Sequence, residues 1–406
     1  MSNPSHNKSL EAGQDPLARA QKLLRACVHC GFCNATCPTY TLTGDEREGP
    51  RGRLYLMKDL LAGNAPDADL APLDHCVSCK SCETTCPAGV QYTEILDTVR
   101  EHTQKTRPFK ERALDLLTQT ALLKPRLLSL VMRMARLLRP ALPAPLKRHI
   151  PPWEAPLTWP AARHERRVGI LIGCLQPALI PALDAKAAVI LDRLGISAIA
   201  VQTPCCGALP FHLHTHDKAR LDARAALSLV EESDIQGLTS TASGCTSFLH
   251  DYPRLFQNLP EAARAQDLST QVHDIARWID PALLPKERPD RRLTIAWHAP
   301  CSLQHGLKAA SRVQAILEAL GHTLAPIQES ALCCGSAGPY SVRHPRFAKA
   351  LGRRKWRALT GHNPALVVTA NVGCLQHLAG LGDRPVRHWL DLVYDAFTNQ
   401  DKDGRD

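Results

Sequence analysis

The sequence contains no run of 18 apolar residues, and this absence excludes a membrane-spanning helix. The closest approach, LLSLVMRMARLL, is interrupted by Arg133 and Arg136. The chain also lacks the nucleotide-binding G-x-G-x-x-G and P-loop motifs, and it lacks the H-E-x-x-H and G-x-S-x-G motifs of metalloproteases and serine hydrolases. We therefore expect neither a flavin nor a nicotinamide on this chain, and we predict no catalytic residue within it.

The first 16 residues, MSNPSHNKSLEAGQDP, are polar and lack the apolar core of a secretory signal, so we expect a cytoplasmic protein. The 16 cysteines are too sparse for a disulfide scaffold, and they are clustered. The vicinal pairs Cys205–Cys206 and Cys333–Cys334 are poorly placed for structural disulfides. Clustered cysteines in a reducing compartment more often bind metal or carry out redox chemistry.

Two stretches, CVHCGFCNATCP and CVSCKSCETTCP, repeat the spacing C-x2-C-x2-C-x3-C-P. This is the spacing of bacterial ferredoxins that hold two clusters, in which the fourth cysteine of each run ligates the other cluster. The alternative, a pair of zinc sites, fits less well because zinc sites usually take C-x2-C pairs far apart in the sequence. We predict two 4Fe-4S clusters, the first held by Cys27, Cys30, Cys33 and Cys86 and the second by Cys37, Cys76, Cys79 and Cys82.

The second half of the sequence is duplicated. Corresponding cysteines of the two copies are offset by 127, 128 and 129 residues. In each copy apolar runs such as RVGILIG and LTIAWH alternate with helical segments, and we expect strands at ISAIAVQ, HTLAPIQ and ALVVTANVG as well. Such alternation predicts parallel sheets with helices on their faces, and it places the cysteines at the carboxyl ends of strands.

The second group of eight cysteines resembles the cysteine-rich "CCG" domain of heterodisulfide reductase subunits, which can hold an unusual iron–sulfur cluster. The fifth cysteine of that pattern is replaced by Phe248 in the first copy and by His377 in the second. Three interpretations remain: a metal ion or further iron–sulfur cluster, favoured in the second copy because His298 and His377 can assist; a redox or docking dithiol; or buried packing residues. We do not nominate His212, His214 or His216, which are expected at the surface or at helix caps. The residues concerned are Cys174, Cys205, Cys206 and Cys245 in the first copy, and Cys301, Cys333, Cys334 and Cys374 in the second.

We expect a multi-domain fold, an α-helical two-cluster ferredoxin domain followed by duplicated α/β CCG domains. The formal net charge of +10 is confined to residues 105–167, which contain fourteen Lys or Arg and only four acidic residues. A single local basic surface argues against nucleic-acid binding. This surface can lie on anionic membrane lipids, dock a partner protein, or be an ordinary solvated helix pair. The expected division is a disordered tail at 1–14, the ferredoxin domain at 15–104, a basic helical and proline-rich linker at 105–165, and CCG domains at 166–288 and 289–398.

Nearly the whole chain resembles the iron–sulfur subunits of glycolate oxidase (glycolate dehydrogenase). The likeness is densest in HCVSCKSCETTCPAGVQY, LCCGSAGPYSVRHP and VVTANVGC. It implies a hetero-oligomer in which FAD-containing partner subunits oxidise glycolate to glyoxylate while this chain passes electrons toward a quinone-type acceptor, in the cytoplasm or at the inner face of the cell membrane. The alternatives are a related lactate or glycerol-3-phosphate dehydrogenase subunit, or an enzyme that reduces a disulfide at a CCG site.

Overall fold

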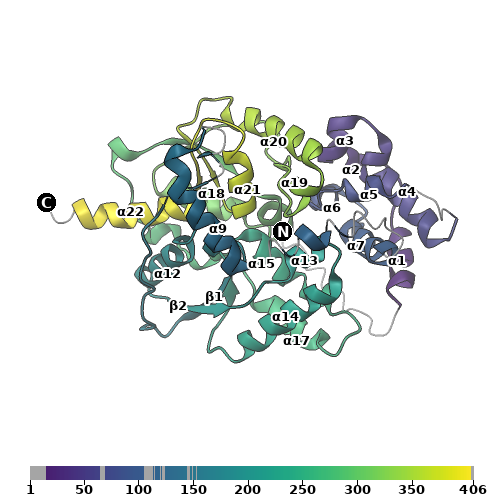
Figure 1. Cartoon of the computed structure of the whole chain (residues 1–406), viewed down its shortest axis with the longest axis horizontal. Helices are drawn as coiled ribbons and strands as arrows, with labels where there is room; N and C mark the ends of the chain where they lie inside the picture. Colours follow the sequence, from purple (N-terminus) through teal and green to yellow (C-terminus); the bar gives the residue numbers. More distant parts are fainter. Residues whose placement is uncertain are drawn as a thin grey trace.

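The computed structural model describes residues 15–64, 69–104, 113, 115–118, 120, 124–143, 147–148, 150–151 and 153–403. The tail predicted at 1–14 and part of the linker predicted at 105–165 lie outside these residues. Figure 1 shows the short amino-terminal helices gathered at one end of the molecule, with the sheets and their helices forming the rest.

The amino-terminal region is built from short helices, as predicted, and none of the residues described between 15 and 104 forms a strand. Several of these helices begin with proline, which is favoured there because the first turn of a helix does not use its N–H groups. A small apolar core formed by Met57, Leu73, Ile95 and Leu96 holds the helices together. The elements are α1 (Pro16–Leu24), α2 (Phe32–Ala35), α3 (Pro38–Thr43), η1 (Glu46–Glu48), α4 (Pro50–Leu61), α5 (Ala71–Asp74), α6 (Ser81–Thr85) and α7 (Tyr92–Thr103).

The first α/β unit is a parallel sheet of strand order β2-β1-β3. The sequence predicts the strands β1 (Arg167–Ile172) and β2 (Ser197–Gln202), and it gives no indication of the short β3 (Leu238–Thr239). The accompanying helices are α11 (Gln176–Leu179), α12 (Leu183–Arg193), α13 (Ala208–His212), α14 (His216–Glu231), α15 (Ser243–His250), α16 (Tyr252–Leu255), α17 (Ala262–Gln271), η4 (Ile275–Trp278) and η5 (Pro281–Leu283).

The second unit repeats this arrangement with the order β5-β4-β6-β7, again parallel throughout. The strand expected in HTLAPIQ is only β5 (Thr323–Leu324), because the chain leaves the sheet at Ala325, which precedes Pro326. The other elements are η6 (Pro289–Arg291), β4 (Thr294–His298), η7 (Ser302–Gly306), α18 (Ala310–Ala319), α19 (Tyr340–Arg343), α20 (Pro345–Thr360), β6 (Leu366–Thr369), α21 (Val372–Ala379), β7 (Val386–His388) and α22 (Trp389–Asp403).

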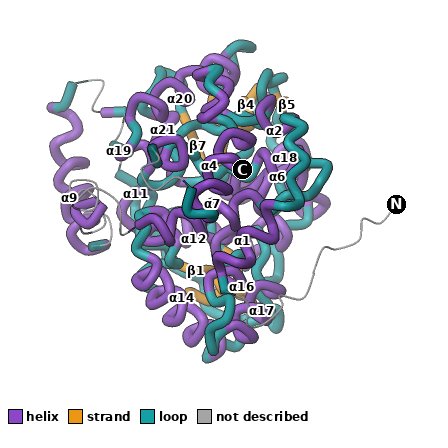
Figure 2. The backbone as a smooth tube through the Cα atoms, turned by 90° about the vertical axis from the view of Figure 1, so that its right-hand side faces the viewer, coloured by secondary structure: helices purple, strands orange, loops and turns teal. Residues whose placement is uncertain are grey.

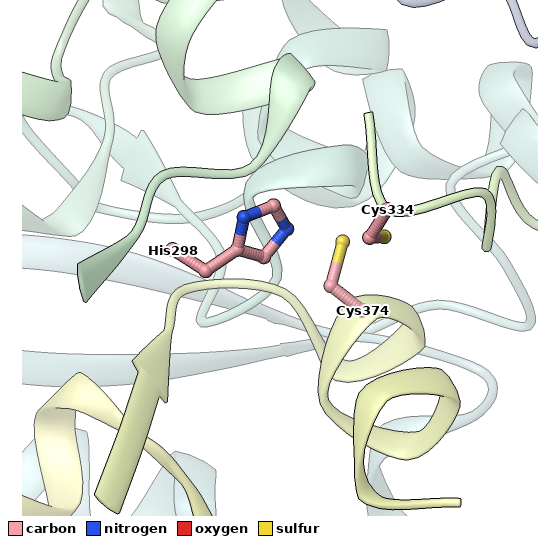
Figure 3. A group of neighbouring side chains, drawn as sticks. All are labelled: His298, Cys334 and Cys374. Carbon is pink, nitrogen blue, oxygen red and sulfur yellow. The ribbon is translucent and has the colours of Figure 1, made fainter. Parts of the chain in front are cut away.

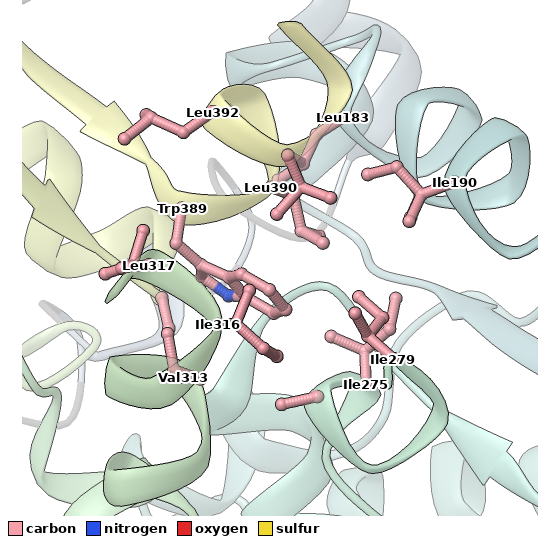
Figure 4. Close-up of a cluster of buried hydrophobic side chains, with 14 of the residues drawn as sticks. Leu183, Ile190, Ile275, Ile279, Val313, Ile316, Leu317, Trp389, Leu390 and Leu392 are labelled. Carbon is pink, nitrogen blue, oxygen red and sulfur yellow. The ribbon is translucent and has the colours of Figure 1, made fainter. Parts of the chain in front are cut away.

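The two α/β units share a large apolar core, and each also has a smaller core cluster of its own. Figure 4 shows Trp389 and Leu390 of the second unit beside Leu183 and Ile190 of the first. The contact between the two units is reinforced by a buried ion pair, in which Lys186 Nζ lies 2.7 Å from Asp391 Oδ1. The duplicated halves therefore form a single packed body.

Helix α9 (Pro125–Leu138), followed by η3 (Arg139–Ala141), lies on the outside of this body (Figures 1 and 2). The guanidinium of Arg136 fixes it by donating to the carbonyl oxygens of Ala178 and Leu179, at 2.8 and 3.0 Å. The structure describes no helix that is both long enough and apolar enough to cross a bilayer.

Candidate metal centres

The two cysteine runs have the same unusual backbone. Residues two and four positions after the first cysteine take positive φ in both: His29 (55°) and Gly31 (84°) in the first run, Ser78 (51°) and Lys80 (61°) in the second. Side chains other than glycine rarely adopt this conformation, so its recurrence indicates one loop geometry used twice. Such a loop can turn successive cysteines toward a common centre.

The first cavity is lined by Cys27, Cys30 and Cys33 of the first run together with Cys82 and Cys86 of the second. Burial, and then the charges of Cys27, Cys86 and Cys30, raise the pKa of Cys33 to about 11. Bringing such thiols together without a cation is unfavourable, because like charges oppose ionisation. The donor set therefore fits a cationic iron–sulfur centre, which binds thiolates.

The second cavity is lined by Cys37 of the first run and by Cys76, Cys79 and Cys82 of the second. Burial, followed by the charges of neighbouring cysteines that include Cys37, raises the pKa of Cys82 well above its ordinary value. The buried guanidinium of Arg53 lies 3.8 Å from Cys37 Sγ, and it is held by Glu48 Oε2 at 2.8 Å. Each cavity thus receives thiols from both runs.

The two cavities differ in their exposure to solvent. Cys30 is exposed, and its neighbours Val28 and Phe32 are 70% and 63% exposed, although both are apolar. His29 stacks on the exposed Tyr55 with ring centroids 4.2 Å apart. The first cavity therefore opens beside an apolar surface patch, which we call the Val28 patch (Val28, Phe32 and Tyr55).

The second cavity is covered by the second α/β unit. The sulfur of Cys301 is hydrogen-bonded to Cys79 and to Cys333. The apolar contacts that enclose this junction include Val77 and Tyr340, and the Tyr340 hydroxyl donates to the carbonyl of His75 at 3.0 Å. The two cysteine-rich parts of the chain therefore meet at Cys79.

In the first α/β unit the four cysteines form a continuous group that is mostly buried. Cys205 is hydrogen-bonded to Cys174 and Cys206, and Cys206 is hydrogen-bonded to Cys245. The backbone N–H of Gly207 donates to Cys205 Sγ at 3.3 Å. Together these hydrogen bonds, with those from Cys174 and Cys206 the largest, lower the pKa of Cys205 well below its ordinary value. All four cysteines follow strands, as the sequence predicts.

The second unit brings its cysteines together in the same order and adds a histidine. Cys333 is hydrogen-bonded to Cys301 and Cys334, and Cys334 to Cys374. Figure 3 shows the ring of His298, at the end of β4, directed toward Cys334 and Cys374. The expectation that His377 would join this group is wrong, because its Nε2 instead lies 3.2 Å from the carbonyl oxygen of Ala348.

A cavity of about 290 Å³ lies where the amino-terminal region meets both α/β units. Its wall carries thiols of both cysteine groups, among them Cys79 and Cys301, and the cations Lys80 and Arg254. His212 and His214 also line it. His212 is exposed, as expected, whereas His214 and His216 are buried, so the expectation that those two lie at the surface is wrong. The sequence carried no signal for this, because the cavity forms only where distant segments meet.

Two family models match the chain. A 4Fe-4S dicluster domain covers residues 23–90, and a cysteine-rich domain matches twice, at residues 168–250 and 295–379. The two matches to the cysteine-rich domain cover the two parallel sheets, except for β7 at Val386–His388. The fold is thus a helical ferredoxin-type region followed by a duplicated α/β domain.

The chain is also similar to curated proteins over most of its length. It is 40% identical to the glycolate oxidase iron-sulfur subunit of Escherichia coli (strain K12), over 94% of this chain and 96% of that protein. It is 27% identical to the probable glycolate oxidase iron-sulfur subunit of Bacillus subtilis (strain 168), over 91% and 93%. Lactate utilization protein A of an Exiguobacterium strain is 23% identical over 52% of this chain and 89% of that protein.

Proposed function

The chain belongs to the family of glycolate oxidase iron–sulfur subunits, and from this premise we propose that it conducts electrons from flavin-binding partner subunits, which oxidise glycolate to glyoxylate, toward a quinone-type acceptor. It acts on the cytoplasmic side as one subunit of a hetero-oligomer. The observation that carries this proposal is the pair of neighbouring thiol-lined cavities, each of which receives cysteines from both runs.

The ligands of the first cluster are Cys27, Cys30, Cys33 and Cys86, and those of the second are Cys37, Cys76, Cys79 and Cys82. The grouping of Cys86 with Cys33, and of Cys37 with Cys82, supports this crossed assignment. Cys82 lines both cavities, which supports a short distance between the two centres. When bound, the two clusters supply one-electron conduction.

The residues around the cavities assist this conduction in two ways. The exposed Val28 patch offers an apolar docking surface beside the first cavity, and exposed apolar patches commonly mark protein interaction sites. Around the second cavity, the buried cation Arg53 favours the more negative, reduced state of a thiolate-bound centre. We infer that electrons enter beside the Val28 patch and move inward toward Cys79.

The experiment is a dye-linked assay under anaerobic conditions. The isolated chain, the flavin-binding subunits and the complete complex are each given glycolate, then lactate and glycerol 3-phosphate. We expect the dye to be reduced rapidly by the complex with glycolate and not by the isolated chain. Activity of the isolated chain would refute the assignment, and a preference of the complex for lactate or glycerol 3-phosphate would refute the substrate.

Helix α9 is the membrane contact of this subunit. Its residues Leu130, Met134, Leu137 and Leu138 are each more than half exposed, at positions that share one face of a helix. The exposed Arg133 and the exposed Lys124 lie on the same helix or at its start. An exposed apolar stripe with basic residues is the pattern of a helix that lies in the headgroup region of anionic lipids.

A further inference from the structure

The end of β4 holds a compact group of metal-binding atoms that lies apart from the two ferredoxin cavities. One ring nitrogen of His298 and the sulfur atoms of Cys334 and Cys374 all lie within 4.8 Å of one another. Within the part of the chain that the structure describes, no other group of three His, Cys, Asp or Glu side chains is this compact. The eight ferredoxin cysteines form no such group, as expected if each sulfur of a site binds a different iron of a cube.

His298 itself indicates a missing ligand. Its side chain is 1% exposed, and neither Nδ1 nor Nε2 has a hydrogen-bond partner among the described residues. Buried polar atoms are rarely left without a partner, because their desolvation is then uncompensated. The ring nevertheless points at two thiols (Figure 3), and a metal ion would satisfy one of its nitrogens.

The internal duplication provides a comparison within the same chain. His298 stands three residues before Cys301, and the residue three before Cys174 is Leu171. Leu171 packs in an apolar core together with Cys174, Cys205 and Cys206. The first copy therefore has four cysteines at equivalent places but no imidazole, so only the second copy combines nitrogen and sulfur donors.

We propose that the second α/β unit binds a single zinc ion through His298, Cys334 and Cys374. Zinc takes imidazole and thiolate ligands in tetrahedral geometry, with sulfur about 2.3 Å and nitrogen about 2.0 Å from the metal, so its ligand atoms lie close together. A single ion fits the compact group better than a cluster does. Zinc has no redox chemistry, and the ion would tie β4, the CCG turn and α21 together without accepting electrons.

The position of this site gives the ion a structural role in the electron-transfer subunit. Cys334 contacts Cys333, Cys333 contacts Cys301, and Cys301 contacts Cys79 beside the second ferredoxin cavity. The zinc ion therefore fixes the wall on which the ferredoxin region rests. This inference goes beyond the proposed function and does not depend on the substrate of the partner subunits.

The test uses the full chain, purified without oxygen and dialysed against zinc at micromolar concentration. Zinc and iron are counted per chain, and X-ray absorption at the zinc edge identifies the ligands without interference from iron. We expect about one zinc per chain, with at least two sulfur and one nitrogen neighbours at the distances typical of protein zinc sites. The variants His298→Ala and Cys374→Ser each remove a proposed ligand and should weaken zinc binding by at least about tenfold, because the loss of a residue that only supports a ligand already costs about 10–100-fold.

The matched controls lie in the first copy, where Cys206→Ser and Cys245→Ser correspond to Cys334 and Cys374. These variants should retain zinc, and unchanged ferredoxin iron in every variant shows that the chain is folded. If a variant fails to fold, the absorption spectrum of the unsubstituted chain still decides. Zinc bound only through sulfur or oxygen, no zinc at all, or extra iron that His298→Ala removes would each overturn the proposal.

Discussion

Cys86 belongs to the second cysteine run, yet it lines the first cavity and its charge acts on Cys33 of the first run. The sequence alone predicts this crossing, because the fourth cysteine follows the third by one residue more than the others are spaced. At the scale of the residue, the proposed function depends on such crossings, since they hold the two centres together.

The variant Cys86→Ser should therefore damage the first cluster rather than the second. We expect iron to fall by up to half and one of two electron paramagnetic resonance signals of the reduced chain to change. The companion variant Cys37→Ser should change the other signal. If Cys86→Ser and Cys79→Ser alter the same signal, the crossed assignment is wrong.

Arg53 should set the potential of the second cluster. Its buried guanidinium lies 3.8 Å from Cys37 Sγ, and a nearby cation favours the reduced state. We expect Arg53→Gln to lower the reduction potential of that cluster by tens of millivolts, and Arg53→Lys to lower it less. The measurement is a redox titration monitored by electron paramagnetic resonance.

The matched control is Arg47→Gln in the same segment, because Arg47 is exposed and pairs with Asp45 rather than with a thiol. That variant should leave both potentials unchanged. An equal shift for Arg47→Gln and Arg53→Gln would show that the effect is not local.

His388 should make the stability of the second α/β unit depend on pH. Burial lowers its pKa to about 4, against the opposing charge of Asp391. The folded state therefore prefers the neutral ring. The contribution of His388 to the free energy of unfolding is complete above the ordinary histidine pKa of about 6.5, and it is lost as pH falls toward 4. We expect a loss of about 2 kcal/mol between about pH 7 and about pH 5.

The measurement is denaturant unfolding of the chain and of His388→Asn at both pH values. The variant should lose correspondingly less stability on acidification, whereas His362→Asn, at an exposed histidine, should behave as the unsubstituted chain does. Identical pH dependence of all three proteins would contradict the assignment to His388.

At the scale of the element, the long strands and helices were readable from the sequence and the short ones were not. The apolar runs that became β1 and β4 are parallel strands with buried central residues, and their apolar composition alone identifies them. β3 has only two residues, and it is fixed by its pairing with Gly169 and Ile170 of β1. Such pairings join segments that are distant in the sequence. The contact between Cys301 and Cys79 is of the same kind, and no spacing rule could have predicted it.

Helix α9 gives a prediction at the same scale. The full complex should co-sediment with vesicles of phosphatidylglycerol at low salt and less at high salt, because lipid charge and the basic residues attract each other within a screening length of about 10 Å at 0.1 M salt. Leu137→Ala and Arg133→Gln should each weaken this binding severalfold.

The control is Leu221→Ala on α14, at a leucine that is 59% exposed but lies outside this stripe. It should bind vesicles as the unsubstituted complex does. If no variant changes vesicle binding, α9 does not bind lipid. If the α9 variants instead release the flavin-binding subunits, α9 binds a partner protein and not lipid.

At the scale of the whole molecule, the ferredoxin region is clamped onto both α/β units by polar contacts. Lys80 pairs with Asp251 at 2.5 Å, and Arg254 pairs with Asp97 at 2.6 Å. The guanidinium of Arg354 donates to the carbonyl of Thr41 at 3.2 Å. The proposed electron carriers are therefore enclosed on one side and open to a partner at the Val28 patch on the other.

The most direct test is to add glycolate to the anaerobic complex and to record its electron paramagnetic resonance spectrum. We predict that glycolate reduces the iron–sulfur clusters of this chain in the complex, and that it leaves the isolated chain oxidised although dithionite reduces it. Clusters that stay oxidised in an active complex, or an isolated chain that glycolate reduces, would contradict the account.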